Sequence, residues 1–171
     1  MENEYQDYII KIVGNLADKY DVEEGRDCII DQTVEIFQED KSIERFDLYF
    51  YDTFKALDKD MDIVDIADTF TQDVYDLAIV GQNQVDRLIE IDNPEFNCSF
   101  NFISIVYDSP LSDLKAFKLG LDYMLSLYKE QYGLVLVFVP NNVMLPEEWG
   151  YTRIHDNIIN ENNGNLYMKM A

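Results

Sequence analysis

The six residues Leu134–Val139 (LVLVFV) are apolar without a break. A run this short and this rich in β-branched residues is typical of a strand that is covered on both faces. Such a strand has to lie inside a sheet, with other elements packed above and below it. We therefore expect an interior strand in the C-terminal half of an α+β domain.

The sequence around this run predicts further elements. Residues 84–91 (QVDRLIEI) alternate like a strand, Asn93 and Pro94 indicate a turn, and residues 100–107 (FNFISIVY) predict a second strand. Ser112 is a candidate cap for a helix that holds Leu114 and Tyr128, and Asn165–Met170 (NLYMKM) predicts the last strand. Residues 82–171 are therefore expected to form a β-β-α-β-β sheet layer.

Residues 1–81 predict four acidic helices in front of this layer, all within a single domain of residues 1–171. The apolar residues between Tyr5 and Tyr20 recur at helical spacing, and a second helix is expected over residues 28–37. Ser42 is a candidate cap for a third helix, although the segment FDLYFY also alternates as a strand would.

The fourth helix has the clearest pattern. Its apolar residues between Ile63 and Ala78 fall within about 120° of a helical wheel, and Gly81 is expected to end it. Five aspartates occupy the opposite arc: Asp62, Asp65, Asp68, Asp73 and Asp76.

The chain is strongly acidic, with 34 acidic residues against 13 basic ones and a formal net charge of -21. Residues 1–95 hold 26 acidic and 8 basic residues, so the N-terminal half carries almost the whole excess. Such a charge repels phosphates and excludes DNA, RNA and anionic membranes as direct ligands. Its uneven distribution indicates an interaction surface. Halophily is another source of acidity, but the many Ile, Asn and aromatic residues argue against it.

Other sequence features bear on location. Cys28 and Cys98 form no motif and fit buried thiols in a reducing compartment. A disulfide between them is the alternative. We find no signal peptide and no stretch of 18 apolar residues. The cytoplasm is the expected location, and it is the host cell cytoplasm if the protein is phage-encoded.

Motifs for metals and nucleotides are incomplete. Asp58, Asp60 and Asp62 match the first ligands of a calcium loop, but Ile63 and Thr69 stand where glycine and glutamate are needed. His155 is the only histidine, and the 7 glycines form no phosphate-binding loop. The sequence therefore predicts no cofactor, no metal site and no catalytic residue.

The C-terminal segments resemble the second half of a GNAT-type N-acetyltransferase. The resemblance covers about 75 residues, in which Gly150 and Tyr151 match an aromatic strand and the segment from Leu166 to Lys169 matches the final strand. It implies an acyl-CoA-dependent enzyme whose cofactor pyrophosphate binds backbone N–H groups at a helix N-terminus. The matching stretch, residues 108–113, departs from that pattern because it has no glycine, one proline and two aspartates.

Two classes of function remain. The first is a non-enzymatic acidic inhibitor that binds the nucleic-acid-binding surface of a basic partner protein by DNA mimicry. Anti-CRISPR and anti-restriction proteins of phages resemble this chain in composition. The second is the GNAT-like acetyltransferase with an atypical cofactor loop, and an acidic chaperone for a basic partner is a weaker third. The residues expected to bind the partner are Asp58, Asp60, Asp62, Asp65, Asp68, Asp73, Asp76, Glu39 and Asp40.

Overall fold

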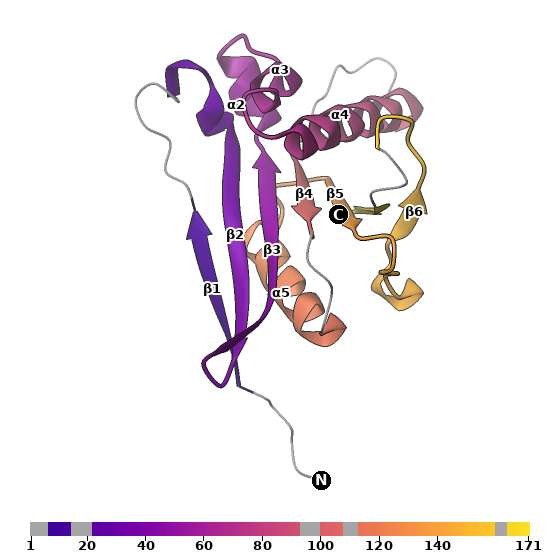
Figure 1. Ribbon diagram of the computed structural model, residues 1–171. Coiled ribbons are helices and arrows are strands. Elements are labelled where there is room, and N and C mark those ends of the chain that lie inside the picture. Colours follow the sequence, from indigo (N-terminus) through magenta and orange to yellow (C-terminus); the bar gives the residue numbers. More distant parts are fainter. Residues whose placement is uncertain (1–6, 15–21, 93–99, 108–112, 160–163) are drawn as a thin grey trace.

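The computed structural model describes residues 7–14, 22–92, 100–107, 113–159 and 164–171 (Figure 1). The elements follow one another along the chain as β1 (Tyr8–Gly14), η1 (Arg26–Cys28), β2 (Ile29–Gln38), β3 (Lys41–Tyr51), α2 (Thr53–Asp58), α3 (Ile63–Ala67), α4 (Gln72–Asp92), β4 (Phe102–Val106), α5 (Leu114–Leu127), β5 (Leu134–Val139), η2 (Glu147–Trp149), β6 (Thr152–Ile154) and β7 (Asn165–Met170). The class is α+β.

In this part of the chain, seven strands form one mixed sheet in the spatial order β1-β2-β3-β4-β5-β7-β6. Only β4 and β5 run parallel, and α5 connects them. The other neighbouring strands are antiparallel. Residues 1–81 and 82–171 thus contribute strands to the same sheet.

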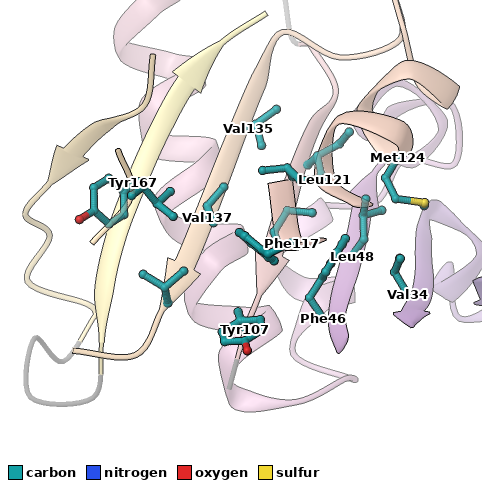
Figure 2. Packing of buried hydrophobic residues seen from close by; sticks show 14 of the residues in the cluster. Val34, Phe46, Leu48, Tyr107, Phe117, Leu121, Met124, Val135, Val137 and Tyr167 are labelled. Carbon is teal, nitrogen blue, oxygen red and sulfur yellow. The ribbon is translucent and has the colours of Figure 1, made fainter. Parts of the chain in front are cut away.

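One face of the sheet packs against α5. The side chains of Phe117 and Leu121 from α5 meet alternate residues of the central strands, such as Val135 and Val137 (Figure 2). Phe117 also meets the ring of Phe46 edge-on, with the ring centroids 5.3 Å apart. This aromatic cluster fixes α5 against the middle of the sheet.

The other face packs against α2, α3 and α4. Here the intervening residues of the strands, among them Phe102, Leu134 and Leu136, form a second buried cluster with residues of the helices such as Leu77 and Val85. Because successive side chains of a strand point to opposite faces, the two clusters together cover the central strands completely.

The structure confirms the apolar run as a strand and most of the elements predicted around it, but residues 84–91 belong to helix α4. Leu134–Val139 is an interior strand between β4 and β7, and five of its six residues are buried. The strand at Asn165–Met170 is also confirmed. The predicted helix is α5, but Asp113 caps it by accepting a hydrogen bond from the N–H of Ala116. The cap predicted at Ser112 lies outside the described residues.

The first two helices predicted at the start of the chain are wrong over the described residues, and the third segment follows its strand alternative until α2 begins at Thr53. Residues 8–14, 29–38 and 41–51 are the strands β1, β2 and β3. The side chains of Tyr8, Ile10 and Ile12 alternate toward the α5 cluster, a spacing of two that the helical interpretation overlooked. Segments rich in Ile and Val favour strands because their branched side chains pack well on a pleated surface.

The fourth predicted helix and the strand predicted at residues 84–91 also need correction. The helix is divided into α3 and α4, and α4 continues through Gly81 to Asp92. Gly81 lies against the ring of Phe102, where a Cβ atom would approach the ring to 2.3 Å. Glycine is therefore required for close packing at this point and does not end the helix.

Candidate binding surface on the helical layer

The aspartates of the predicted acidic stripe are surface carboxylates of two helices, α3 and α4. Asp62, Asp65 and Asp68 belong to α3 and its two caps, whereas Asp73 and Asp76 lie in the first turns of α4. All are exposed except Asp76, which is partly buried and accepts a hydrogen bond of 2.7 Å from the Gln72 side chain. The stripe predicted on one helix is therefore split at the connection between two.

Two carboxylates of the helical layer also hold the local backbone, one from the stripe and one from outside it. The side chain of Asp62 accepts a hydrogen bond of 2.7 Å from the N–H of Val64 and caps α3. Asp52 caps α2 in the same way through the N–H of Lys55, at 3.0 Å. Negative charge is favourable at helix N-termini, so part of the acidity has a structural role.

Asp60 has a less favourable position. The N–H groups of Asp60 and Met61 donate to the carbonyls of Leu57 and Ala56, both at 2.9 Å, in the Schellman pattern that ends α2. Asp60 is the left-handed residue of this motif, with φ of 60°. Glycine is the usual residue there because it has no Cβ atom. The aspartate therefore adds surface charge at some expense in stability.

A groove of about 630 Å³ opens beside Asp60, between the α2–α3 connection and the C-terminal half of α4. Its lining includes the buried apolar residues Ala56 and Ile63, the exposed Leu57 and the partly buried Met61 and Ile89. Four carboxylates line it. They are Asp60, Asp62, Asp86 and Glu90.

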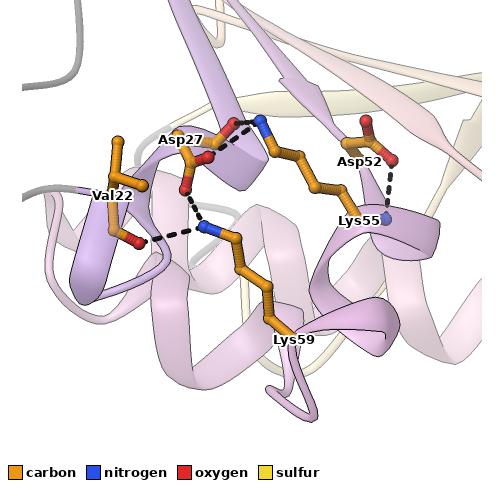
Figure 3. Close-up of polar contacts among 5 residues, drawn as sticks. All are labelled: Val22, Asp27, Asp52, Lys55 and Lys59. Atoms are coloured by element: carbon orange, nitrogen blue, oxygen red, sulfur yellow. Dashed lines mark hydrogen bonds and ion pairs between the residues drawn. The ribbon is translucent and has the colours of Figure 1, made fainter.

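The two lysines of α2 are held away from this groove. Lys55 and Lys59 both reach Asp27, with N–O distances of 2.8 and 2.6 Å, and Lys59 also donates to the carbonyl oxygen of Val22 (Figure 3). Neither lysine lines the groove. Both lysines of α2 are therefore committed to η1 and the segment before it.

These ion pairs are strong enough to alter ionisation. Partial burial of Asp27 disfavours its charged form, but the hydrogen bonds and charges of Lys55 and Lys59 outweigh burial and hold the pKa of Asp27 below its ordinary value. The same contact raises the pKa of Lys55. Both groups stay charged at neutral pH, which fixes the two lysines on Asp27.

The remaining residues predicted to bind a partner lie elsewhere. Glu39 and Asp40 form the tip of the hairpin between β2 and β3, at the opposite end of the strands from α2, α3 and α4 (Figure 1). β3 has 11 residues, so about 35 Å separates this tip from α2. Asp58 is exposed at the end of α2 but does not line the groove.

The N-terminus of α5 bears on the acetyltransferase alternative. The N–H of Asp113 donates to one carboxylate oxygen of the buried Glu44 at 2.6 Å, and the hydroxyl of Tyr107 donates to the other at 2.6 Å. Asp113 itself accepts from the N–H of Ala116. Two of the protein's own carboxylates thus occupy donors at the helix end where the GNAT resemblance would place a pyrophosphate.

The other residues singled out from the sequence have ordinary environments. Tyr151 is buried, which raises its pKa, and the Lys169 ammonium lies 5.2 Å from the centre of its ring. His155 is exposed. The buried Cys28 is a free thiol whose pKa is raised by burial, and Cys98 lies outside the described residues. Within the described ranges, no cluster of His, Cys, Asp or Glu is arranged to hold a metal ion.

The chain has no significant match to a protein-family model, to a curated protein or to a solved structure. None of the described helices is long and apolar enough to cross a membrane.

Sequence reasoning missed half of the carboxylates in the groove. Asp86 and Glu90 went unnoticed because residues 84–91 were interpreted as a strand. The spacing of Val85, Leu88 and Ile89 also fits one face of a helix, and that signal would have placed both carboxylates on the outer side of a longer α4.

Proposed function

We propose that this protein is a non-enzymatic acidic inhibitor that binds the nucleic-acid-binding surface of a basic partner protein. The helical layer formed by α2, α3 and α4 is the contact surface. The proposal includes a cytoplasmic location, in the host cell if the protein is phage-encoded, where it would act against a CRISPR or restriction system.

The charge of the helical layer carries this proposal. Residues 52–90 contain ten acidic and three basic residues, a balance of -7. Two of the three basic side chains, Lys55 and Lys59, are paired with Asp27. Exposed carboxylates with so few neutralising partners repel one another, and a partner surface lined by Lys and Arg relieves that repulsion.

The spacing of the carboxylates along α4 can be compared with the spacing of phosphates in DNA. Asp76, Asp86 and Glu90 share the outer arc of α4 and lie about 15 and 6 Å apart along the helix axis. Duplex DNA presents one charge per about 1.7 Å of axis. Helix α4 alone is therefore too sparse, and the carboxylates around α3 are needed to approach a phosphate track.

The structure around Glu44 favours this proposal over the acetyltransferase. A cofactor pyrophosphate at the start of α5 would compete with the carboxylates of Glu44 and Asp113 for the same N–H groups. Two negative charges beside a pyrophosphate would also repel it. A thermal-shift titration with acetyl-CoA separates the two functions, because a ligand of the native state raises the melting temperature.

The test is a pull-down followed by binding kinetics at low and high salt. The test variant carries Asn at Asp62, Asp65, Asp68, Asp73 and Asp76, and a matched control neutralises five carboxylates of the C-terminal half: Asp122, Glu130, Glu147, Glu148 and Asp156. We expect the test variant to associate with the captured partner at least about tenfold more slowly at low salt, with little difference at high salt. Equal kinetics for the test variant and the control at both salt concentrations would refute the proposal.

A further inference from the structure

The groove beside Asp60 combines two kinds of surface. Its apolar lining residues include Leu57, which is 60% exposed, and the partly buried Met61 and Ile89. Its carboxylates come from two separate segments, the α2–α3 connection and α4. A volume of about 630 Å³ lies within the roughly 300–1,000 Å³ range of binding pockets for small molecules and side chains.

The carboxylates of the groove keep free acceptor capacity. Asp62 uses one oxygen to cap α3, and Asp86 uses one oxygen to accept a hydrogen bond of 2.8 Å from the Gln82 side chain. A carboxylate has two oxygens and about four acceptor positions, so each can take further donors. The basic residues of α2 point to Asp27 and do not fill these positions.

A long basic side chain matches this combination. Arg and Lys lay an apolar stem along hydrophobic surface and carry the charge at the tip, and the planar Arg fork binds carboxylates through two hydrogen bonds at once. A compact hydrated metal ion would leave the exposed Leu57 without a contact. An apolar ligand would leave the carboxylates without a partner.

We propose that this groove receives an amphipathic, arginine-bearing segment of the partner protein, with its apolar side chains against Leu57, Met61 and Ile89 and its arginines on the surrounding carboxylates. This inference rests on the proposed function, because it assigns the specific contact within the acidic helical layer. It differs from general charge attraction in one respect: the exposed and partly buried apolar side chains that line the groove have to be accessible.

The experiment tests the shape of the groove and the charge of its carboxylates with separate variants. Leu57→Trp fills the groove without altering charge, and Phe54→Trp is its control, since Phe54 is 52% exposed on the same helix and does not line the groove. A second variant removes the four groove carboxylates: Asp60→Asn, Asp62→Asn, Asp86→Asn and Glu90→Gln. Its control removes four carboxylates outside the groove: Asp58→Asn, Asp65→Asn, Asp68→Asn and Asp73→Asn. Asn preserves the cap at Asp62 and the acceptor at Asp86.

The probe is a fluorescein-labelled synthetic peptide with leucines on one helical face and arginines on the other, and its Kd is measured by fluorescence anisotropy. We expect Leu57→Trp to raise Kd at least about fivefold and the groove carboxylate variant at least about tenfold. Phe54→Trp should stay within about twofold of the wild type. The control that removes charges outside the groove should lose clearly less affinity than the groove variant.

The outcomes distinguish the two proposals. If Leu57→Trp binds the peptide as well as Phe54→Trp, or if both charge variants lose equal affinity, the groove inference is wrong and the broader acidic surface can still stand. If neither charge variant weakens binding, both proposals fail. Thermal melting of each variant verifies that the groove is folded, and the carboxylate variants test the inference independently of the Trp substitution.

Discussion

Gly81→Ala tests whether α4 is continuous and lies where it brings Asp86 and Glu90 to the groove. In an ordinary exposed helix, replacing glycine by alanine stabilises by about 1 kcal/mol. Here the added Cβ atom would lie 2.3, 2.6 and 2.7 Å from three atoms of the Phe102 ring. Real Cβ atoms essentially never approach so closely, so the ring or the helix has to move.

Phe102 has little room to move. It is fully buried and stacks on Tyr51 with the ring centroids 4.4 Å apart. The hydroxyl of Tyr51 is in turn hydrogen-bonded to the Ser104 hydroxyl at 3.0 Å and to the carbonyl of Val74 at 3.2 Å. Overpacking such a site costs about 1–3 kcal/mol, which exceeds the helical gain. Subtracting the helical gain of about 1 kcal/mol, we expect a net destabilisation of up to about 2 kcal/mol.

Urea denaturation followed by circular dichroism gives the measurement. The midpoint should fall without a change in the slope, because the unfolded surface is the same. Asn83→Ala, at an exposed position of the same helix, should stabilise slightly. In a Phe102→Leu background the smaller side chain should make Gly81→Ala less costly. A stabilisation of about 1 kcal/mol by Gly81→Ala alone would show that α4 does not pack on Phe102 at this point.

Four further variants test other parts of the structure by the same denaturation assay. Asp60→Gly should stabilise the free protein by up to about 1 kcal/mol and weaken binding of the arginine peptide, whereas any destabilisation would contradict the left-handed geometry. Glu39 and Asp40 have φ of 49° and 62°, so their replacement by Asn and Gly should stabilise the hairpin by about 1 kcal/mol. Peptide binding should stay unchanged. Weaker peptide binding would place the tip of the hairpin near the groove. Asp27→Asn should lower the free energy of unfolding by about 1 kcal/mol at pH 7 and by less at pH 3. The lowered pKa of the Asp27 carboxyl gives stability that is present above the unfolded pKa of about 4 and is lost as pH falls. An equal loss of stability at both pH values would exclude the ion pairs as its cause. Glu44→Gln should lower the free energy of unfolding by about 2 kcal/mol, because the glutamine NH2 group would face either the N–H of Asp113 or the hydroxyl of Tyr107, both of which are donors. An unchanged urea midpoint would mean that Glu44 is not buried as described.

The C-terminal elements were predictable because their local patterns have one interpretation. The run Leu134–Val139 has no polar residue that a surface helix or an exposed strand would need, so only an interior strand fits. Asn165–Met170 follows a segment rich in Asn and Gly, which isolates it as a separate element. In both cases the local sequence and the tertiary position favour the same structure.

The N-terminal strands were not predictable from spacing alone. The apolar residues Ile9, Ile12 and Val13 fit a helix, while Ile10 and Ile12 fit a strand that has one buried face. Pairing with β2 decides between the two, and that contact is not visible in a local pattern. At Gly81 the local rule also failed, because the ring of Phe102 is distant in sequence and requires a residue without a side chain.

The surface was predicted in part. Exposure of Asp60 and Asp62 follows from local polarity, but the groove depends on how α4 lies against the α2–α3 connection. Asp86 and Glu90 reach it only through that packing. Glu39 and Asp40 share the acidity of the helices but lie at the far end of β3, because composition carries no information about distance.

Competition with nucleic acid is the most direct test of the central claim. A fluorescent DNA or RNA duplex is bound to the partner protein captured in the pull-down, and its anisotropy is measured while this protein is added. The account predicts that the wild-type protein displaces the duplex, and that the five-fold Asn variant at Asp62, Asp65, Asp68, Asp73 and Asp76 requires a higher concentration at low salt. A ternary complex that holds the duplex and this protein on the partner together would contradict the claim, because it would show that the acidic surface and the nucleic acid do not share a binding site.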